Sequence, residues 1–256
     1  MGIINITPDS FYVKGRYKND IGLLKTIEKM LLNNVTFIDI GGYSTRPKAD
    51  FVSEFQERKR VIPALKSIIK EFPSILISLD TFRSKIAEEG IENGASIIND
   101  VSGGNMDSKI FEIIGKYKVP YILNHMKGKQ KNMHLNNKYE NLIIDVIYDL
   151  QKKINILKKF HINDIIVDPG IGFSKDLYQN YSILKNINCI ERLDCPILIG
   201  VSRKSLIYKL LNTSSINALN GTTVLNTYSV LNKISIIRVH DTKEASEVIK
   251  IIKNLL

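Results

Sequence analysis

The residues of this chain that are best suited to chemistry are cations and hydroxyls near its C-terminal end. Arg238 and His240 have the spacing that puts two side chains on one side of an extended strand, as do Ser202 and Lys204. Arginine, lysine and a histidine donor suit oxyanions, arginine through its bidentate fork. Surface ion pairing is the ordinary alternative. However, Arg238 stands within the apolar segment Ile236–Val239, where an unpaired cation is costly to bury and an anionic ligand would remove that cost.

A second set of polar residues consists of two carboxylates and a carboxamide, Asp80, Asn99 and Asp168, each at the end of an apolar segment. Together they could bind a flat heterocycle with several N–H donors, with the carboxylates ionised and hydrogen-bonded. They could instead bind a metal ion. Against a metal, His125 and His240 are far apart, and the ligand-type residues lack the i, i+4 spacing of a helical metal motif.

Two loops rich in glycine and proline complete the set of candidate site residues. Thr7–Phe11 follows the first apolar segment, and Gly41–Pro47 follows the second. Both could be simple turns, which glycine and proline favour. A loop that brings a serine, a threonine and an arginine together is more specific than a turn requires, so we expect the second loop to lie beside the site.

The elements that must position these residues are short β-rich apolar segments that recur about every 30 residues, the length of a βα unit. Amphipathic stretches of helical period separate them, such as Ser53–Ile69, Ser84–Asn93, Tyr139–Lys159 and Thr242–Leu255. Apolar strands alternating with helices indicate a parallel sheet buried on both faces, and eight such units predict a closed (β/α)₈ TIM barrel. The predicted strands are Gly2–Ile6, Val35–Ile40, Ile75–Asp80, Ala95–Asn99, Val119–Asn124, Asp164–Asp168, Pro196–Val201 and Ser235–Val239.

Nearly every predicted strand stops at a polar residue, and in a barrel these C-terminal strand ends form the rim that carries the active site. A single such residue is more often a helix N-cap. Eight of them in one chain favour a shared site. The loops after strands seven and eight commonly hold a phosphate group, which agrees with the cations found there. The polar ends are Asn5, Asp39, Asp80, Asn99, His125, Asp168, Ser202 and His240.

Composition predicts one domain, residues 1–256, because no linker or composition shift divides the chain. No stretch approaches the roughly 20 apolar residues of a membrane span. The first residues lack the features of a signal peptide. Two cysteines, Cys189 and Cys195, fit a reducing compartment. We therefore expect a cytoplasmic protein without a membrane partner, with Lys127–Asn137 as its longest polar loop.

The formal net charge of +10 invites a nucleic-acid interpretation. The charge is mostly lysine, however, and it is spread over predicted helix faces and loops without interleaved aromatic residues. We therefore expect no nucleic-acid partner, because clustering and not net charge is the diagnostic signal. A basic field would still favour an anionic substrate.

Seven segments in order resemble the motifs of the dihydropteroate synthase family, a family of pterin-binding barrels. Any one of them is a weak signal, but together they span residues 2 to 241 and fall on the predicted rim. The resemblance implies a cytoplasmic transferase of folate biosynthesis and a sulfonamide target. The segments are residues 2–11, 39–47, 78–81, 97–104, 167–173, 200–204 and 238–241.

Members of this family condense 6-hydroxymethyl-7,8-dihydropterin pyrophosphate with para-aminobenzoate and release pyrophosphate. The resemblance implies that the pterin is held by Asp80, Asn99, Asp168 and Lys204, in a pocket lined by Gly200 and Phe173. It implies that the pyrophosphate is held by Asn5, Arg238 and His240, with Mg²⁺ bound through Asn5. It implies contacts with para-aminobenzoate from Thr45, Arg46, Pro47, Ser202 and Phe173. The resemblance assigns catalytic roles to Arg238, His240, Lys204, Thr45 and Arg46. It also implies a homodimer that pairs through helices late in the chain.

The sequence departs from the family pattern within the proposed site. Val13 stands where an aspartate is usual, Tyr43 where a glutamate is common, and Asn124 where a methionine usually packs. Two rival functions share the pterin cradle: a methyltransferase acting on a methylated folate, and a pterin-binding protein without activity. The methyltransferase would not need the cations of residues 202–204 and 238–240, which suit pyrophosphate.

Overall fold

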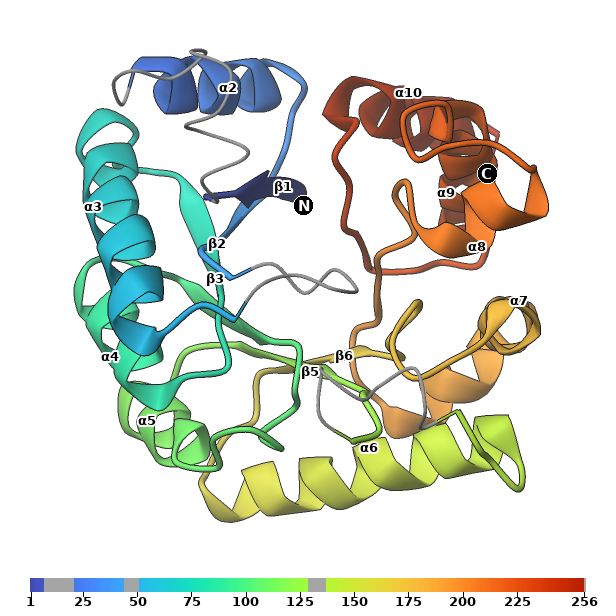
Figure 1. The fold of residues 1–256 in the computed structure, drawn as a ribbon, viewed down its shortest axis with the longest axis horizontal. Coiled ribbons are helices and arrows are strands. Elements are labelled where there is room, and N and C mark those ends of the chain that lie inside the picture. Colours follow the sequence, from blue (N-terminus) through green and yellow to red (C-terminus); the bar gives the residue numbers. More distant parts are fainter. Residues whose placement is uncertain (7–20, 44–50, 129–136, 256) are drawn as a thin grey trace.

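The computed structural model describes residues 1–6, 21–43, 51–128 and 137–255. Within these ranges the chain alternates parallel strands with helices, as the segment pattern predicted (Figure 1). The strands are β1 (Gly2–Asn5), β2 (Phe37–Gly41), β3 (Leu76–Asp80), β4 (Ile97–Asp100), β5 (Tyr121–Asn124), β6 (Ile165–Asp168), β7 (Leu198–Ile199) and β8 (Ile236–Ile237). Each lies within or within one residue of a predicted strand.

The strands close into a barrel. β1 to β6 form one parallel sheet in chain order, and β7 pairs with β8. Isolated bridges join the two pieces, Gly2 to Val239 and Val167 to Ile197. The Ile3 N–H donates to the Val239 carbonyl at 2.9 Å, and the Val167 N–H donates to the Pro196 carbonyl at 2.9 Å. The predicted (β/α)₈ barrel is therefore confirmed.

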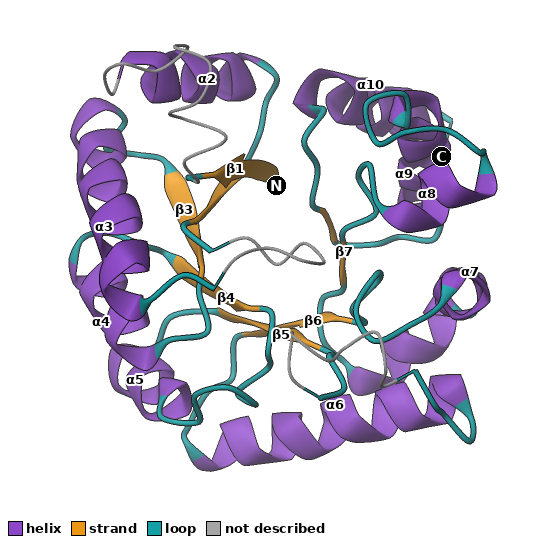
Figure 2. Ribbon diagram, viewed as in Figure 1, coloured by secondary structure: helices purple, strands orange, loops and turns teal. Residues whose placement is uncertain are grey.

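Helices surround the barrel (Figure 2). Sequence stretches with helical period form them, and their ends carry recognisable caps: Ser53 with Gln56, and Asp176 with Gln179, make reciprocal capping boxes. In the described part of the chain, no helix is long and apolar enough to span a membrane. The helices are α2 (Ile21–Leu32), α3 (Glu54–Glu71), α4 (Ser84–Glu92), α5 (Ile110–Tyr117), α6 (Leu142–Lys159), α7 (Leu177–Lys185), the 3₁₀ helix η2 (Ile187–Leu193), α8 (Ser205–Leu210), α9 (Leu219–Leu231) and α10 (Thr242–Lys253).

The two-residue period of the strands separates the main core from the barrel interior. Ile38, Ile40, Ile77 and Leu79 belong to the large cluster that packs strands against helices. A small separate cluster fills the barrel, built on Ile97, Ile122 and Leu198. The same alternation continues to the C-terminal ends of the strands, where the inward-pointing residues are polar and line the mouth of the barrel. They are Asp39, Asp80, Asn99, Asn124, Asp168 and Arg238.

Candidate active site

A small cavity lies at the C-terminal ends of the strands. Its lining brings together the residues predicted to hold a heterocycle with those predicted to hold an anion, as a shared rim site requires. Asn99 and Asp168 are almost fully buried, so their polar groups face the cavity and not bulk water. The lining residues are Asp80, Asn99, Val101, Asn124, Asp168, Phe173, Gly200, Lys204 and Arg238.

Arg238 is already paired within the protein. Its guanidinium lies 2.5 Å from a carboxylate oxygen of Asp39 and 2.9 Å from one of Asp80. The cost of burying this cation, for which the sequence analysis invoked an anionic ligand, is therefore met within the protein by the buried Asp39. Nε and Nη2 are engaged, while Nη1 makes no hydrogen bond within the described part of the chain. Arg238 is thus fixed in orientation and keeps donors for a further ligand.

Asp39 links the two halves of the site. Its carboxylate accepts hydrogen bonds from the Ser78 hydroxyl at 2.5 Å and from the Asn99 amide at 3.2 Å, besides the bond from Arg238. Sequence analysis noted Asp39 as a polar strand end but assigned it no role. In the structure it lies two residues before the end of β2, where period-two counting points it into the barrel, in register with Ser78 of β3.

Lys204, Asp168 and Phe173 form the other wall of the cavity. The Lys204 ammonium donates to the Ile171 carbonyl at 2.5 Å and lies 4.9 Å from the centre of the Phe173 ring. Asp168 accepts the Gly170 N–H at 2.7 Å. The loop after β6 therefore carries the aromatic ring and also orients the cation.

Burial dominates the electrostatics of these groups. It raises the pKa of Asp80, with the Asp39 charge acting in the same direction and Arg238 opposing both. Burial also raises the pKa of Asp168, against the influence of Lys204 and the Gly170 N–H. It lowers the pKa of Lys204 to about 8, against the attraction of Asp168. Such shifted groups in one cavity are typical of a functional site.

Ser202 and His240 meet as the two-residue spacing suggested. The Ser202 hydroxyl accepts the His240 backbone N–H at 3.1 Å and lies 3.0 Å from Nδ1 of the same residue. In the tautomer in which this hydroxyl donates to Nδ1, the ring proton is on Nε2, a donor suited to an anion. The neighbouring Arg203 does not face the cavity, because it pairs with Asp241 at 2.8 Å.

Asn5 ends β1 and is partly exposed. The pairing of β1 with β8 places it on the rim beside the strand that carries Arg238. Magnesium keeps several waters and often takes only one or two protein oxygens besides those of phosphate, so one carboxamide oxygen fits that ion. A cage of several protein ligands is not needed. The described residues hold no group of three or more His, Cys, Asp or Glu that could form one.

Some predicted residues fall elsewhere. His125 follows directly after the C-terminal end of β5, as predicted, but it does not line the shared cavity: it is buried, and its Nδ1 lies 3.0 Å from the Lys175 ammonium. Asn124, the last residue of β5, takes that position instead. The first predicted loop with Val13, and Thr45, Arg46 and Pro47 of the second, lie outside the described residues.

Asn124 brings an unpaired acceptor to the cavity. Its amide nitrogen donates to the Val101 carbonyl at 2.6 Å, while its amide oxygen is buried without a hydrogen-bond partner in the described structure. A carbonyl neighbour can only accept, so the amide cannot be turned round without losing this bond. The sequence marked the position only as a departure from the family pattern.

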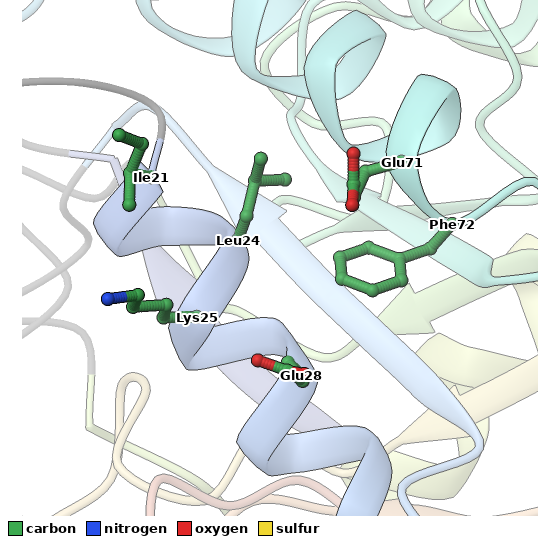
Figure 3. Close-up of a pocket in the computed structure, with 6 residues that line it drawn as sticks. All are labelled: Ile21, Leu24, Lys25, Glu28, Glu71 and Phe72. Atoms are coloured by element: carbon green, nitrogen blue, oxygen red, sulfur yellow. The ribbon is translucent and has the colours of Figure 1, made fainter.

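A second hollow lies on the outside of the barrel (Figure 3). Leu24 of α2 and Phe72, which follows α3, lie on opposite sides of it, and Lys25, Glu28 and Glu71 also line it. It shares no residue with the rim cavity, and its charged residues, Lys25, Glu28 and Glu71, are exposed to solvent, unlike the buried Asn99 and Asp168 of the rim. The rim cavity is therefore the candidate active site.

A closed (β/α)₈ barrel whose rim joins carboxylates, carboxamides and fixed cations defines a protein that can bind a polar heterocycle next to an anion. Residues 1–240 match the family model of pterin binding enzymes. The dihydropteroate synthase of Clostridium beijerinckii is 40% identical over 254 residues, 98% of this chain and 91% of that protein. The Bacillus subtilis enzyme of the same name is 34% identical over 258 residues, 100% of this chain and 88% of that protein.

Solved structures agree. A dihydropteroate synthase of Yersinia pestis in complex with a sulfonamide drug superposes with a TM-score of 0.93 at 35% identity, covering 100% of this chain and 93% of that one. The chain belongs to the dihydropteroate synthase family of pterin-binding enzymes.

Proposed function

We propose that this protein condenses 6-hydroxymethyl-7,8-dihydropterin pyrophosphate with para-aminobenzoate, giving 7,8-dihydropteroate and pyrophosphate. The observation that carries the proposal is one cavity in which acceptors suited to a pterin lie beside cations suited to pyrophosphate. The names of its relatives support the same reaction.

The pterin half of the cavity is a complementary set of donors and acceptors. The Asp80, Asn99 and Asp168 oxygens match the N–H groups of a pterin, and the Lys204 ammonium matches its ring nitrogens and carbonyl. Phe173 and Gly200 supply flat, narrow walls. Carboxylates on one side of the ring also stabilise the positive charge that builds up there as the leaving group departs.

The anion half would hold the leaving group. The C–O bond between the pterin methylene and pyrophosphate breaks, the amine nitrogen of para-aminobenzoate bonds to the methylene carbon, and the amine loses one proton. Arg238, fixed by Asp39 and Asp80, offers its remaining N–H groups to the departing charge, and His240 offers Nε2–H. Asn5 would hold Mg²⁺, which when bound supplies further neutralisation of the pyrophosphate.

The amine substrate would be met at the mouth of the cavity. Ser202 and Phe173 would contact it, together with Thr45, Arg46 and Pro47, which follow β2 in the sequence. The Yersinia pestis structure in complex with a sulfonamide drug supports the proposal that sulfonamides act on this protein too. We further propose that residues 1–256 form one domain and that the protein is cytoplasmic.

A homodimer is the assembly that the surface favours. α9 presents Val224, Tyr228 and Leu231 on one face, with 58%, 37% and 48% of each residue exposed. α10 adds Ile251 at 61% exposure, and α9 contacts α10. A soluble protein that exposes such a row of apolar side chains usually covers it in an interface.

The reaction is tested by incubating the protein with the pterin pyrophosphate, para-aminobenzoate and Mg²⁺, and by measuring dihydropteroate and pyrophosphate together. We expect equal amounts of both, lost when any substrate is omitted and in Asp168→Asn, and retained in the exterior variant Lys243→Ala. A pterin-binding protein without activity would bind the pterin and release no pyrophosphate. Methyl transfer from a methylated folate would favour the other rival.

A further inference from the structure

We propose that Lys175 is the positioning residue of the pterin site: together with His125, it clamps the loop of residues 170–174 so that Phe173 and the Ile171 carbonyl hold Lys204 in place. The inference rests on the proposed pterin site and concerns two residues outside its lining.

The clamp is a largely enclosed ammonium with three acceptors. Lys175 Nζ lies 3.0 Å from Nδ1 of His125, 3.1 Å from the Gly170 carbonyl and 3.1 Å from the Phe173 carbonyl. An ammonium group has three N–H donors, so this set uses all of them. The Gly170 and Phe173 carbonyls are the two ends of one tight turn, and His125 directly follows β5.

The clamped turn would not hold its shape from local preference alone. Gly170 and Gly172 have φ of +73° and +85°, and Ser174, a non-glycine, has φ of +51°. The two glycines adopt these angles freely, but a non-glycine such as Ser174 is strained there unless the surroundings over-determine it. The Lys127 carbonyl accepts the Ser174 hydroxyl at 2.7 Å, Asn180 accepts the Gly172 N–H at 2.6 Å, and the Phe173 N–H donates to the Gly170 carbonyl at 3.0 Å to close the turn. The Lys175 ammonium adds a side-chain tie between the same two ends, through both of their carbonyls.

The turn connects the clamp to the site. The Ile171 carbonyl accepts from the Lys204 ammonium at 2.5 Å, and the Phe173 ring lies 4.9 Å from the same group. A loop displaced by an ångström would move both contacts, and errors of that size in a binding site weaken it strongly.

The charges that face Lys175 come from four elements. Its pKa is lowered to about 7. Burial is the main cause and Lys204 acts in the same direction, while Asp168 on β6 and Asp149 on α6 oppose the shift. The neighbouring His125 has its pKa held well below the usual value by burial and by Lys175, Lys153 and Lys127. A neutral amine has two N–H groups for three acceptors, so the clamp weakens as pH rises through about 7.

The test measures the dissociation constant of 6-hydroxymethylpterin for wild type and Lys175→Met between pH 6 and pH 9. Their ratio cancels the titration of the ligand, while the His125 variants below test the clamp with the Lys175 charge still present. We expect Lys175→Met to bind on the order of tenfold more weakly at pH 6. The ratio should fall toward one above about pH 8, where the wild-type clamp has also lost its proton. A ratio that is constant with pH, or near one at pH 6, would overturn the proposal.

Lys153→Met is the matched control. Lys153 is a buried lysine that lies 3.2 Å from Asp149 in the same region, and its Nζ makes no hydrogen bond within the described part of the chain. Its loss should leave the affinity for pterin unchanged at every pH. An effect equal to that of Lys175→Met would mean that any buried cation here matters only for packing, which would refute the clamp.

A pair of His125 variants tests the clamp without removing the lysine, in case Lys175→Met does not fold. Asn places an acceptor near the position of Nδ1, and Leu does not; both lose the 3.9 Å contact of Nε2 with Asp149. We expect His125→Leu to weaken pterin binding severalfold at pH 6 and His125→Asn to restore most of it. Equal binding by the two variants contradicts the clamp. Failure of the wild type itself to bind pterin would instead refute the proposed function.

Discussion

At the scale of single residues, the site works through coupled charges and not through isolated groups. Arg238 pairs with two carboxylates at once, and Asp39 accepts hydrogen bonds from a hydroxyl, an amide and the guanidinium. Removing one member therefore changes the ionisation of the others, because each pKa depends on the remaining charges. Roles assigned by mutation must be measured at more than one pH.

Arg238→Ala separates the two halves of the cavity. Arg238 lowers the pKa of Asp80, so its removal leaves Asp80 more easily protonated. We expect the variant to bind phosphate-free 6-hydroxymethylpterin about as well as wild type at pH 8 and roughly tenfold more weakly at pH 6. Binding of pyrophosphate should weaken about a hundredfold at both values.

Asp80→Asn is the companion variant, measured by the same titrations. It should weaken pterin binding at both pH values, because the ring loses a charged acceptor. If Arg238→Ala abolished pterin binding at pH 8 while Asp80→Asn left it intact, the two roles would be reversed.

Lys204 gives a prediction with a defined sign. Its folded pKa of about 8 lies below the unfolded value of about 10.4, so the folded state binds fewer protons between those values and gains stability as pH rises. Lys204→Met lacks this gain. Urea unfolding should therefore show the stability of wild type, relative to Lys204→Met, increasing from about pH 8 to pH 10. If the difference in unfolding free energy between the two proteins did not change with pH, the lowered pKa of the buried Lys204 would be contradicted.

At the scale of elements, the loop after β6 depends on glycine. A Cβ added to Gly170 would lie 1.9 Å from the His125 carbonyl oxygen, and its φ is +73°. We expect Gly170→Ala to lose roughly 3 kcal/mol of stability, measured by thermal unfolding. Gly200→Ala is the control, since its nearest atoms lie at 3.7 Å. It should unfold near the wild-type temperature and yet bind pterin more weakly, because its methyl group enters the cavity. Equal stability of the two variants would contradict this account of the loop.

The strands and their order were predictable because each is a short apolar segment with a polar end, and both signals are local. The pairing of Arg238 with Asp39 was not, because the two residues are 199 positions apart and meet only when β8 closes against β1. That His125 stays out of the cavity was also not predicted. The strand ends at Asn124, as predicted, but successive side chains point to opposite faces, so Asn124 lines the cavity and the next residue, His125, does not.

At the scale of the whole molecule, the net charge of +10 suits the anionic substrate of the proposed reaction. The described surface also carries the exposed apolar residues of α9, which the proposed dimer would bury. Sedimentation at micromolar concentration should show about twice the chain mass of 29.1 kDa. Replacing Val224 and Leu231 with Asp should give monomers, while Ile144→Asp, an equally exposed isoleucine on α6, should not. A monomeric wild type would contradict the proposal.

The central claim is that the rim cavity binds the pterin. The most direct measurement is a crystal structure of the protein soaked with 6-hydroxymethylpterin pyrophosphate. The account predicts density for the ring among Asp80, Asn99, Asp168 and Lys204, with the pyrophosphate beside Arg238 and His240. Density in the outer hollow between α2 and α3, or no density in the rim cavity at a saturating concentration, would contradict it.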